Sequence, residues 1–554
     1  MTTRGKAKNI INICECHDYC LFLQYKHIIH AMATITNRRP PVGIQSFVEI
    51  RKRGYLYVDK TDIVWNLANG VKFNYLSRPR RFGKSVLVDT LKAYLEGRRE
   101  LFEGLKIMDL ETEWVERPVI RLDMSRGGAS QASLRSYLNN AFKEYEEKYG
   151  IVAQQEDSLA DRFHRVIKTA YEQTGHQVAV LIDEYDSPLQ HSWHTAEHEA
   201  CTALYREVFA ILKADDEMER IVFITGITKF TQISLFSVLN NLMNISFEPE
   251  YASICGITKQ ELLDNFMPEI ERMAECNEWT ADETLAKLKA YYDGYHFSRR
   301  NMVDVYNPFS LINALYQKDL KSYWASSGST SLLPKFVGDI EIHLNDFDHC
   351  RIDRITLESS DVTGGGPELF LYQSGYLTIK SADEFGYNLG IPNEEVRQAL
   401  NAMVLPALTM RKQGDTVSLQ SNLLYQLGTG QLDEAKKSMR ALIADVPYSN
   451  KKLASMDMEE RYRLIMSTIL QAVGIRVEVE RMLATGRIDL VAWLSRYIYV
   501  IELKLSNNGG IAAAERQIRE CGYTEPFKAD KRKVVGLAVE LDSEGKGLID
   551  WRVV

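Results

Sequence analysis

Short apolar runs separated by longer amphipathic stretches dominate the chain between residues 73 and 226. Four of these runs have the uninterrupted hydrophobicity of strands that are buried on both faces. They read FNYLS from Phe73, VIRLDMS from Val119, QVAVLID from Gln177 and RIVFIT from Arg220. Because the stretches between them have the length of crossover helices, the pattern predicts an α/β fold with an open parallel sheet and helices on both faces.

The pattern becomes helical after Tyr251, with helices expected over 259–271 and 281–292 as a lid region. Farther along, a β-like LFLYQSGYLTI alternates with amphipathic helices. Near the C-terminus a helix over 458–473 precedes two apolar strands, IDLVAWL and YIYVIELKL, and the helix AAAERQIRECGY follows them. This last part predicts a small α/β domain built on a β-hairpin.

The first apolar strand leads into a turn that ends with Gly83, Lys84 and Ser85 and continues as a helix. That layout is typical of a P-loop, where backbone N–H groups and the helix N-terminus face phosphate oxygens while the lysine and the serine serve the terminal phosphates and Mg²⁺. Arg78 stands where the usual pattern has a glycine. An ordinary strand-to-helix turn with basic surface residues is the alternative for this motif taken alone.

The strand from Gln177 delivers Asp183 and Glu184 at its carboxyl end. A P-loop site needs one carboxylate there for the Mg²⁺ shell and, when water is activated, a second one as base. We assign these roles to Asp183 and Glu184, with acids that only cap a turn as the alternative. The next strand suggests Thr225 or Thr228 as a sensor of the γ-phosphate. The residues expected to contact ATP and its Mg²⁺ are Arg78, Pro79, Arg80, Arg81, Phe82, Gly83, Lys84, Ser85, Asp183, Thr225 and Thr228.

Composition limits the partners. The net charge of −8 argues against a uniformly basic nucleic-acid coat but allows local basic patches. No run of eighteen apolar residues occurs, so no membrane partner is expected. Five cysteines are scattered singly through the chain, which suits free thiols in a reducing cytoplasm.

Three more cysteines, Cys14, Cys16 and Cys20, lie near the start of the chain. Their spacing follows no standard zinc pattern, so we favour another interpretation over a metal site. Met32 opens MATITNRRPPVGIQSF, and the first 31 residues are expected to be an upstream extension that is flexible or not normally translated.

The C-terminal hairpin carries Asp489 on its first strand and Glu502 and Lys504 on its second. Alternate residues of a strand face the same side, so Glu502 and Lys504 project together, and the neighbouring strand can bring Asp489 to them. This arrangement resembles the active-site skeleton of the PD-(D/E)xK nucleases. Two carboxylates make a Mg²⁺ or Mn²⁺ site for phosphodiester cleavage, and the lysine orients or activates water. The alternative is an edge-strand salt bridge in a small α/β domain.

Two helical residues would complete that site. Glu460 on the preceding helix is the candidate for a third metal-side acid, and Gln517 on the following helix is the candidate for a contact with substrate or scaffold. Both have the alternative interpretation of exposed polar residues on a helix surface.

From Pro41 onward the chain resembles a bacterial family of AAA-ATPase-like proteins with a C-terminal PD-(D/E)xK nuclease-superfamily domain. The resemblance rests on GIQSF, GYLYVDKT, SRPRRFGKS, LIDEYDSPL, FITGITKF, LNNLMNIS, DGYHFS, VYNPFSL, YWASSG, GRIDL and IELK. It implies that Arg78 belongs to the P-loop pattern, since members typically read RPRRFGKS. It also implies a cytoplasmic ATP-binding protein with a nuclease-like tail.

The sequence therefore predicts an ATPase coupled to a metal-dependent nuclease module that acts on DNA. A nucleotide-controlled switch or scaffold, whose nuclease-like domain binds without cutting, is the alternative, and homo-oligomer formation stays open. The expected domains are an extension at 1–40, a P-loop ATPase domain at 41–255, a helical lid or winged-helix-like region at 256–345, a mostly helical connection at 346–454 and a nuclease-like domain at 455–554.

Overall fold

The structure is a computed structural model that describes residues 39–152, 157–229, 239, 241–326, 350–359, 366–400, 413–444, 446 and 457–554. The cysteines of the expected N-terminal extension lie outside these ranges. Contacts within the chain define two compact units. The first contains the residues up to Tyr323 together with Ile352–Tyr387, and the second contains Trp324–Arg351 and Asn388–Val554.

The main sheet of the first unit has the strand order β2-β3-β4-β1-β5, and its paired strands run parallel. Its strands are β1 (Phe73–Ser77), β2 (Val119–Asp123), β3 (Val178–Asp183), β4 (Glu219–Gly226) and β5 (Met243–Asn244). Every residue of β3 is buried, as expected for a central strand covered on both faces. The parallel sheet and four of its strands are therefore confirmed, whereas β5 was not predicted.

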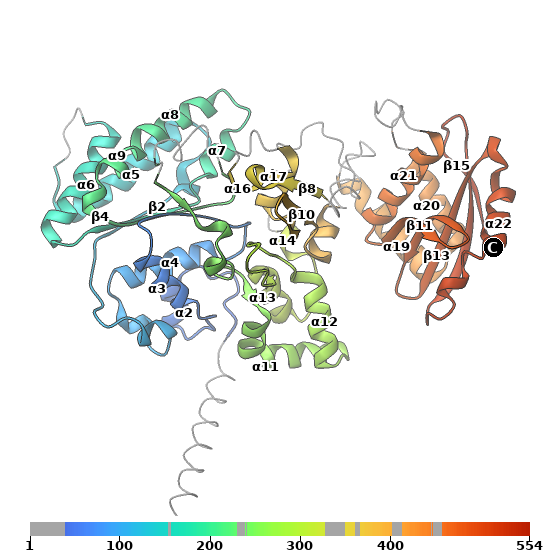
Figure 1. The fold of residues 1–554 in the computed structure, drawn as a ribbon, viewed down its shortest axis with the longest axis horizontal. Helices are drawn as coiled ribbons and strands as arrows, with labels where there is room; N and C mark the ends of the chain where they lie inside the picture. Colours follow the sequence, from blue (N-terminus) through green and yellow to red (C-terminus); the bar gives the residue numbers. More distant parts are fainter. Residues whose placement is uncertain are drawn as a thin grey trace, which may run out of the picture. The chain divides into compact units, whose positions relative to one another are not determined.

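Helices cover both faces of this sheet (Figure 1), with α2, α3 and α4 on one face and α5, α6, α8 and α9 on the other. Their bounds are α2 (Phe47–Lys52), α3 (Thr61–Asn69), α4 (Lys84–Leu95), α5 (Gln131–Tyr149), α6 (Leu159–Thr174), α7 (Ser187–Ser192), α8 (Glu197–Phe209) and α9 (Ile211–Ala214). Because parallel strands all end at one edge, the segments that follow β1, β3 and β4 meet there.

A helical region follows the sheet, and its helices enclose a core of their own. It contains β6 (Ile257–Thr258), α11 (Lys259–Asn277), α12 (Ala281–Tyr292), β7 (Val305–Tyr306), α13 (Pro308–Gln317) and α14 (Tyr323–Ser326). The two predicted lid helices are confirmed, and α11 continues six residues beyond its expected end at 271.

The prediction that LFLYQSGYLTI is β-like was wrong over its first half. The structure has α17 (Gly366–Ser374) there, followed by β9 (Thr378–Ala382). Gly375, at φ 90°, ends the helix and turns the chain into the strand. A short apolar run fits either element, so tertiary packing decided between them. The neighbouring elements are β8 (Cys350–Asp353), α16 (Arg354–Ser359) and β10 (Gly386–Gly390).

The C-terminal part of the second unit is a mixed sheet with the strand order β11-β12-β13-β14-β15. Only the β13–β14 pair is parallel. Its elements are α19 (Gln413–Thr429), α20 (Leu432–Ala444), α21 (Met458–Ala472), β11 (Arg476–Leu483), β12 (Gly486–Trp493), β13 (Tyr497–Leu505), α22 (Gly510–Glu520), β14 (Lys533–Leu541) and β15 (Leu548–Val553). The predicted hairpin is β12–β13.

Two apolar cores lie on the two faces of this sheet. One is shared with α19, α20 and α21, and the other with α22, so the sheet is a layer between helices (Figure 1). No helix in the described ranges combines the length and the hydrophobicity needed to cross a membrane.

Candidate functional site

The turn between β1 and α4 holds Lys84 inside it. Gly83 caps the helix at φ 89°, a left-handed conformation that glycine adopts without strain. Lys84 is 5% exposed, and its Nζ donates to the carbonyls of Arg78 at 2.8 Å and Pro79 at 3.0 Å. Burial lowers the pKa of Lys84, while Glu184, Asp186 and Asp183 act in the opposite direction. The amino group is thus positioned at the edge where phosphates are expected, with Ser85 half-buried next to it.

Arg78 does not face this edge, so its predicted contact with nucleotide finds no support. Its guanidinium is buried, donates to the carbonyls of Ser77, Ser246 and Tyr251 at 2.8–2.9 Å, and stacks 4.1 Å above the Phe297 ring. A buried guanidinium needs such partners because its desolvation is costly. The arginine in place of the usual glycine therefore anchors the start of the turn to the following segments.

The rest of the turn packs outward from the lysine. Phe82 is buried with its ring 4.8 Å from that of Tyr295. Arg81 lies over the Phe309 ring at 4.9 Å, and Arg80 donates to Gln190 at 3.3 Å. Pro79 is buried and contributes its carbonyl to Lys84.

Asp183 and Thr225 meet at the ends of β3 and β4. The Thr225 hydroxyl donates to Asp183 Oδ1 at 2.6 Å, and Arg121 Nη2 lies 3.6 Å from Asp183 Oδ2. Thr225, predicted as a phosphate sensor, thus contacts the Asp183 carboxylate and orients it. Arg121 was missed because it lies inside an apolar strand without a recognisable motif.

Glu184 has the features of a base. Its carboxylate forms no hydrogen bond or ion pair among the described residues, and its backbone adopts φ 50°, which is unusual outside glycine. Burial raises the pKa of Glu184, Lys84 acts against that rise, and Asp183 adds to it. An unpaired carboxylate beside a lysine and a second acid is the arrangement expected of a group that accepts a proton from water.

Thr228 has a different role from the predicted one. Asp186, which was not predicted, is buried and accepts from the Thr228 hydroxyl at 2.7 Å and from the backbone N–H groups of Ile227 and Thr228 at 3.0 and 2.6 Å. Asp186 thus fixes the chain after β4. The Thr228 hydroxyl also accepts from Gln190 at 2.9 Å, so both side chains hold it in place.

An open cleft of about 200 Å³ adjoins the turn. Its walls are largely apolar and come from the PVGIQSF segment, from the turn and the start of α4, and from the helical region. The lining includes Ile44, Ile50, Phe82, Val86, Ile254 and Phe309, and its polar and charged residues include Gln45, Lys60, Arg81 and Asn313. Largely apolar walls of this kind pack against flat or apolar parts of a ligand. Sequence reasoning missed this cleft because its walls come from distant segments.

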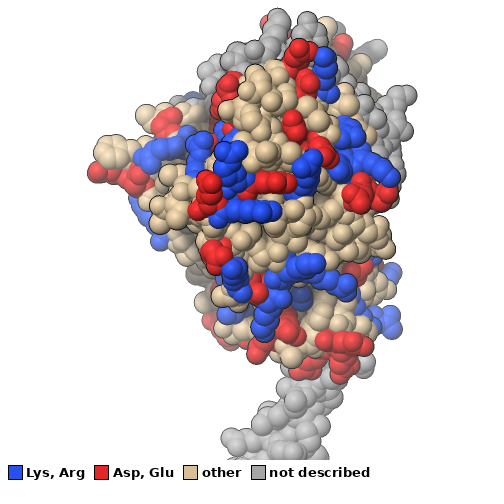
Figure 2. Space-filling view, turned by 90° about the vertical axis from the view of Figure 1, so that its right-hand side faces the viewer, with Lys and Arg blue, Asp and Glu red and all other residues tan. Residues whose placement is uncertain are grey.

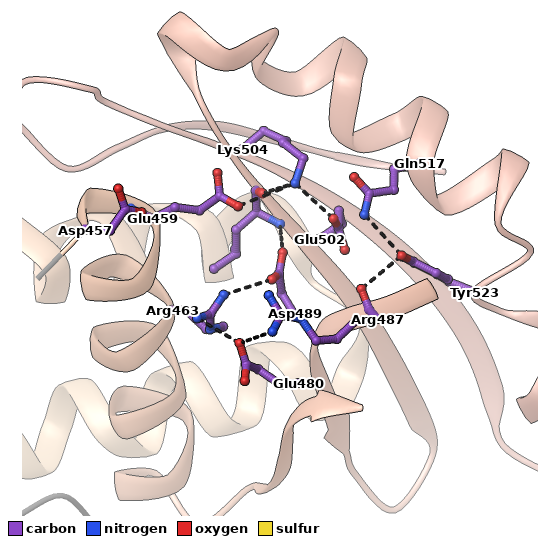
Figure 3. A network of polar contacts seen from close by, with 11 residues as sticks. Asp457, Glu459, Arg463, Glu480, Arg487, Asp489, Glu502, Lys504, Gln517 and Tyr523 are labelled. Carbon is purple, nitrogen blue, oxygen red and sulfur yellow. Dashed lines mark hydrogen bonds and ion pairs between the residues drawn. The ribbon is translucent and has the colours of Figure 1, made fainter. Parts of the chain in front are cut away.

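The predicted nuclease residues come together on β12 and β13 (Figure 3). Glu502 is 1% exposed, and Lys504 Nζ donates to its Oε1 at 3.1 Å. Asp489 Oδ2 accepts from the backbone N–H of Leu503 at 2.9 Å, which places Asp489 beside Glu502. Burial and the charge of Asp489 raise the pKa of Glu502 to about 7, against the effect of Lys504. The other oxygen of Glu502, Oε2, is buried and has no hydrogen-bond partner.

Glu459, and not the predicted Glu460, joins this group. Lys504 Nζ lies 3.5 Å from Glu459 Oε1, whereas Glu460 is exposed and makes none of the contacts of the site. One residue along a helix turns the side chain by about 100°, so only one of the two can face the sheet. Gln517 donates to the Tyr523 hydroxyl at 3.1 Å, close to Glu502 in Figure 3.

Arg463 is the residue that sequence reasoning missed here. Its Nη1 lies 3.3 Å from Asp489 Oδ1 and its Nη2 lies 2.9 Å from Glu480 Oε1. Glu480 and Asp489 face each other where the β11–β12 pairing is interrupted between Val479↔Leu490 and Arg481↔Ile488. Two carboxylates opposite each other repel. Arg463 offsets this cross-strand pair of like charges, and Arg487, whose Nη1 lies 2.9 Å from Glu480 Oε1, contributes to the same compensation.

The chemistry of these side chains fits a hard divalent cation. The described residues contain no group of three or more His, Cys, Asp or Glu side chains arranged to hold a metal ion by themselves. Mg²⁺ usually takes one or two carboxylates and completes its shell with water and substrate phosphate. Asp489 and the partnerless Glu502 oxygen meet that requirement on β12 and β13.

Comparison with known proteins supports both assignments at the level of the domain. Residues 41–236 match the family model described as predicted AAA-ATPase, and residues 457–551 match the model of the PD-(D/E)XK nuclease superfamily. The chain therefore joins an AAA-ATPase-like domain to a C-terminal domain of the PD-(D/E)XK nuclease superfamily.

Similar chains are also found. The uncharacterized protein in the vnfD 5′ region of Azotobacter chroococcum mcd 1 is 29% identical over 537 residues, which cover 94% of this chain and 99% of that protein. Among solved structures, the Aeropyrum pernix ORC1 protein in complex with DNA is 12% identical, with a TM-score of 0.24 over 62% of this chain and 93% of that one. The Aeropyrum pernix ORC2 protein in ADPNP–ADP complexes is 12% identical, with a TM-score of 0.25 over 66% and 96%.

Proposed function

We propose that this protein binds and hydrolyses ATP in its first unit and cleaves DNA with a divalent metal in its second. The observation that carries the nuclease assignment is the meeting of Asp489, Glu502 and Lys504, with one buried Glu502 oxygen lacking any partner. A buried carboxylate oxygen without a donor is unfavourable unless a cation or a proton completes it.

In the ATPase unit, Lys84 serves the β- and γ-phosphates by exchanging its two carbonyl partners for phosphate oxygens. Ser85 and Asp183 hold Mg²⁺, with Thr225 orienting the carboxylate. Glu184, whose carboxylate is unpaired, takes the proton of the attacking water. The cleft beside the turn receives the base.

In the nuclease unit, Asp489 and Glu502 hold Mg²⁺ or Mn²⁺, which supplies Lewis-acid stabilisation of the phosphodiester. Lys504 orients the attacking water and stabilises negative charge on the phosphate. Glu459 takes the third acidic position that the sequence had assigned to Glu460, because Glu459 is the helix carboxylate that reaches Lys504.

A two-by-two measurement tests the proposal. ATP hydrolysis and degradation of assorted DNAs in Mg²⁺ or Mn²⁺ are measured for the full chain, Glu184→Gln and Glu502→Gln, with and without ATP. We expect Glu502→Gln to abolish cleavage and leave ATP hydrolysis intact, and Glu184→Gln to abolish hydrolysis and change cleavage through the nucleotide state. Unchanged cleavage in Glu502→Gln would show that the observed activity has another source.

One observation favours the second candidate, a nucleotide-controlled switch whose nuclease-like domain binds without cutting. Arg463 already compensates the charge of Asp489, so this carboxylate does not need a metal ion as its partner. If no metal and no nucleotide condition gives cleavage while DNA is retained by the protein, the switch is the correct function.

A further inference from the structure

Basic and acidic side chains are interspersed on the face of the molecule that Figure 2 shows. With a net charge of −8, a surface for nucleic acid has to be a local excess of basic residues. Such an excess occurs at one end of the C-terminal sheet. The strand register brings together Arg476 at the start of β11, the β12–β13 turn and Lys533 at the start of β14.

We call this surface the basic end. Its members are Arg476, Arg481, Arg496, Lys531, Arg532 and Lys533. Backbone contacts fix their arrangement, because Lys533 N donates to the Arg496 carbonyl at 2.9 Å and Arg532 Nη1 donates to the Leu494 carbonyl at 3.3 Å.

Aromatic rings support three of the guanidinium groups. Arg476 and Arg532 lie 5.5 and 5.0 Å from the centroid of the Trp493 ring, and Arg481 lies 4.8 Å from that of Phe527. The two rings contact each other edge to face at 5.3 Å. Guanidinium groups held in this way lose less conformational entropy when they bind a ligand, because they are already ordered.

The charge of the basic end is only partly compensated. Glu478 pairs with Arg476 and Arg481, and Asp530 pairs with Arg532. Six basic residues against two acids leave an excess of four positive charges. Arg496, Lys531 and Lys533 are exposed, and their side chains form no hydrogen bond or ion pair within the described part of the chain.

We propose that the basic end binds the sugar-phosphate backbone of duplex DNA. The proposal deepens and rests on the nuclease function.

Acidic residues surround Lys504 at the metal site, whereas the basic end lies at the opposite end of β13. Tyr497 on β13 pairs with Lys533 of the basic end, and Glu502 lies five residues farther along the same strand. At about 3.3 Å per residue this is about 17 Å, the rise of about five base pairs. The basic end therefore holds phosphates about five base pairs from the cut.

The test measures binding apart from cleavage. Affinity for a duplex DNA is measured over a range of salt concentrations without divalent metal, for the full-length protein and two double variants. Lys531→Gln with Lys533→Gln should reduce the slope of log affinity against log salt by about two and weaken binding about 60-fold near 0.1 M salt. The matched control is Lys437→Gln with Lys546→Gln, two exposed lysines of the same unit that should leave the slope unchanged.

Several results would overturn the proposal: no binding of duplex DNA at low salt, equal losses in the two double variants, or a Lys531 and Lys533 dependence seen with duplex RNA alone. If DNA binding depends on salt and on Lys531 and Lys533 but no cleavage occurs, the basic end is confirmed as a DNA-binding surface and the proposed nuclease activity is rejected. For a cleaving protein, substrates with fewer than about five base pairs on one side of the cut should be cut poorly. Equal cleavage of substrates with shorter and longer flanking duplexes would contradict the predicted distance of about five base pairs between the basic end and the cut.

Discussion

The phosphate turn and the nuclease site both place acids at strand ends, but the two sites satisfy their charges differently. In the first, Lys84 is held by two carbonyls and Asp183 by Thr225 and Arg121. In the second, a buried Glu502 oxygen has no partner, although Lys504 bonds to the other oxygen.

This difference shows that a buried polar group in a ligand-free site can exist in two states, with protein partners or without them. A lysine bonded to carbonyls exchanges equivalent partners when phosphate arrives, so its site is stable while empty. A carboxylate without a partner depends on a proton or a cation, which is reflected in its pKa of about 7. Metal binding at Glu502 should therefore respond more strongly to pH than phosphate binding at Lys84 does.

The largest expected effect concerns the phosphate turn. Lys84→Ala should weaken ATP binding and reduce hydrolysis by about 10²-fold or more, because a charge at the phosphates is lost. Glu184→Gln should keep ATP binding and lose hydrolysis by a similar factor, since an amide accepts no proton. Nucleotide binding and phosphate release, measured on both variants, separate the two roles. Normal hydrolysis in Glu184→Gln would remove that residue from the role of base.

The corresponding change at the second site is Asp489→Ala. It removes one of two metal-binding carboxylates, so metal-dependent DNA cleavage should fall by about 10²-fold while ATP hydrolysis stays near that of the parent. Cleavage and phosphate release are followed in the same preparation. Parallel loss of both activities would instead point to misfolding, which a melting curve reveals.

Glu219 offers a control for the interpretation of Glu502. It is fully buried, neither oxygen has a partner, and burial, with Asp215 and Asp216 contributing, raises its pKa to about 9. A pKa of about 9 in the folded state, against about 4.3 unfolded, means that the folded chain keeps a proton that the unfolded chain releases. Stability should therefore fall as pH rises from about 4.3 to 9.

Glu219→Gln should remove this pH dependence. Its free energy of unfolding relative to that of the parent should therefore rise by on the order of 2 kcal/mol as the pH increases from 6 to 8. Denaturant unfolding at both pH values measures it, with the exposed Glu217→Gln as the control. If the stability of Glu219→Gln and that of the parent depended equally on pH, burial would not raise the pKa of this carboxyl group to the expected extent. The raised pKa of Glu502 would then need another cause.

Arg463→Gln tests the compensation at the nuclease site. Without the guanidinium, Glu480 and Asp489 repel each other, so Mn²⁺ should bind about tenfold more tightly while the metal-free protein melts at a lower temperature. Calorimetric titration with Mn²⁺ and melting with and without it measure both effects. Arg461→Gln on the same helix is the control. Weaker Mn²⁺ binding in Arg463→Gln would show that Arg463 supports the site instead of competing with the metal.

The smallest expected effect distinguishes neighbouring residues of α21. Glu459→Gln should reduce cleavage several-fold because its carboxylate lies near Lys504, and Glu460→Gln should leave it unchanged. Initial rates at saturating metal give the comparison. The reverse order would favour the original assignment of Glu460.

The sequence by itself predicted which strands carry the side chains of both candidate sites. Uninterrupted apolar runs identified β1 to β4, the acids at the end of β3 followed from the run before them, and period-two alternation placed Glu502 and Lys504 on one side of β13. These inferences hold because strand burial and strand periodicity are local properties of the chain.

The tertiary structure decided what depends on distant segments meeting. It turned Arg78 into a buried anchor, assigned Thr225 to Asp183 and Thr228 to Asp186, and brought Arg463 between two facing carboxylates. It also chose a helix for the first half of LFLYQSGYLTI, where local periodicity fits two elements. Polar partners, clefts and charge compensation arise between segments far apart in sequence, so spacing along one segment cannot specify them.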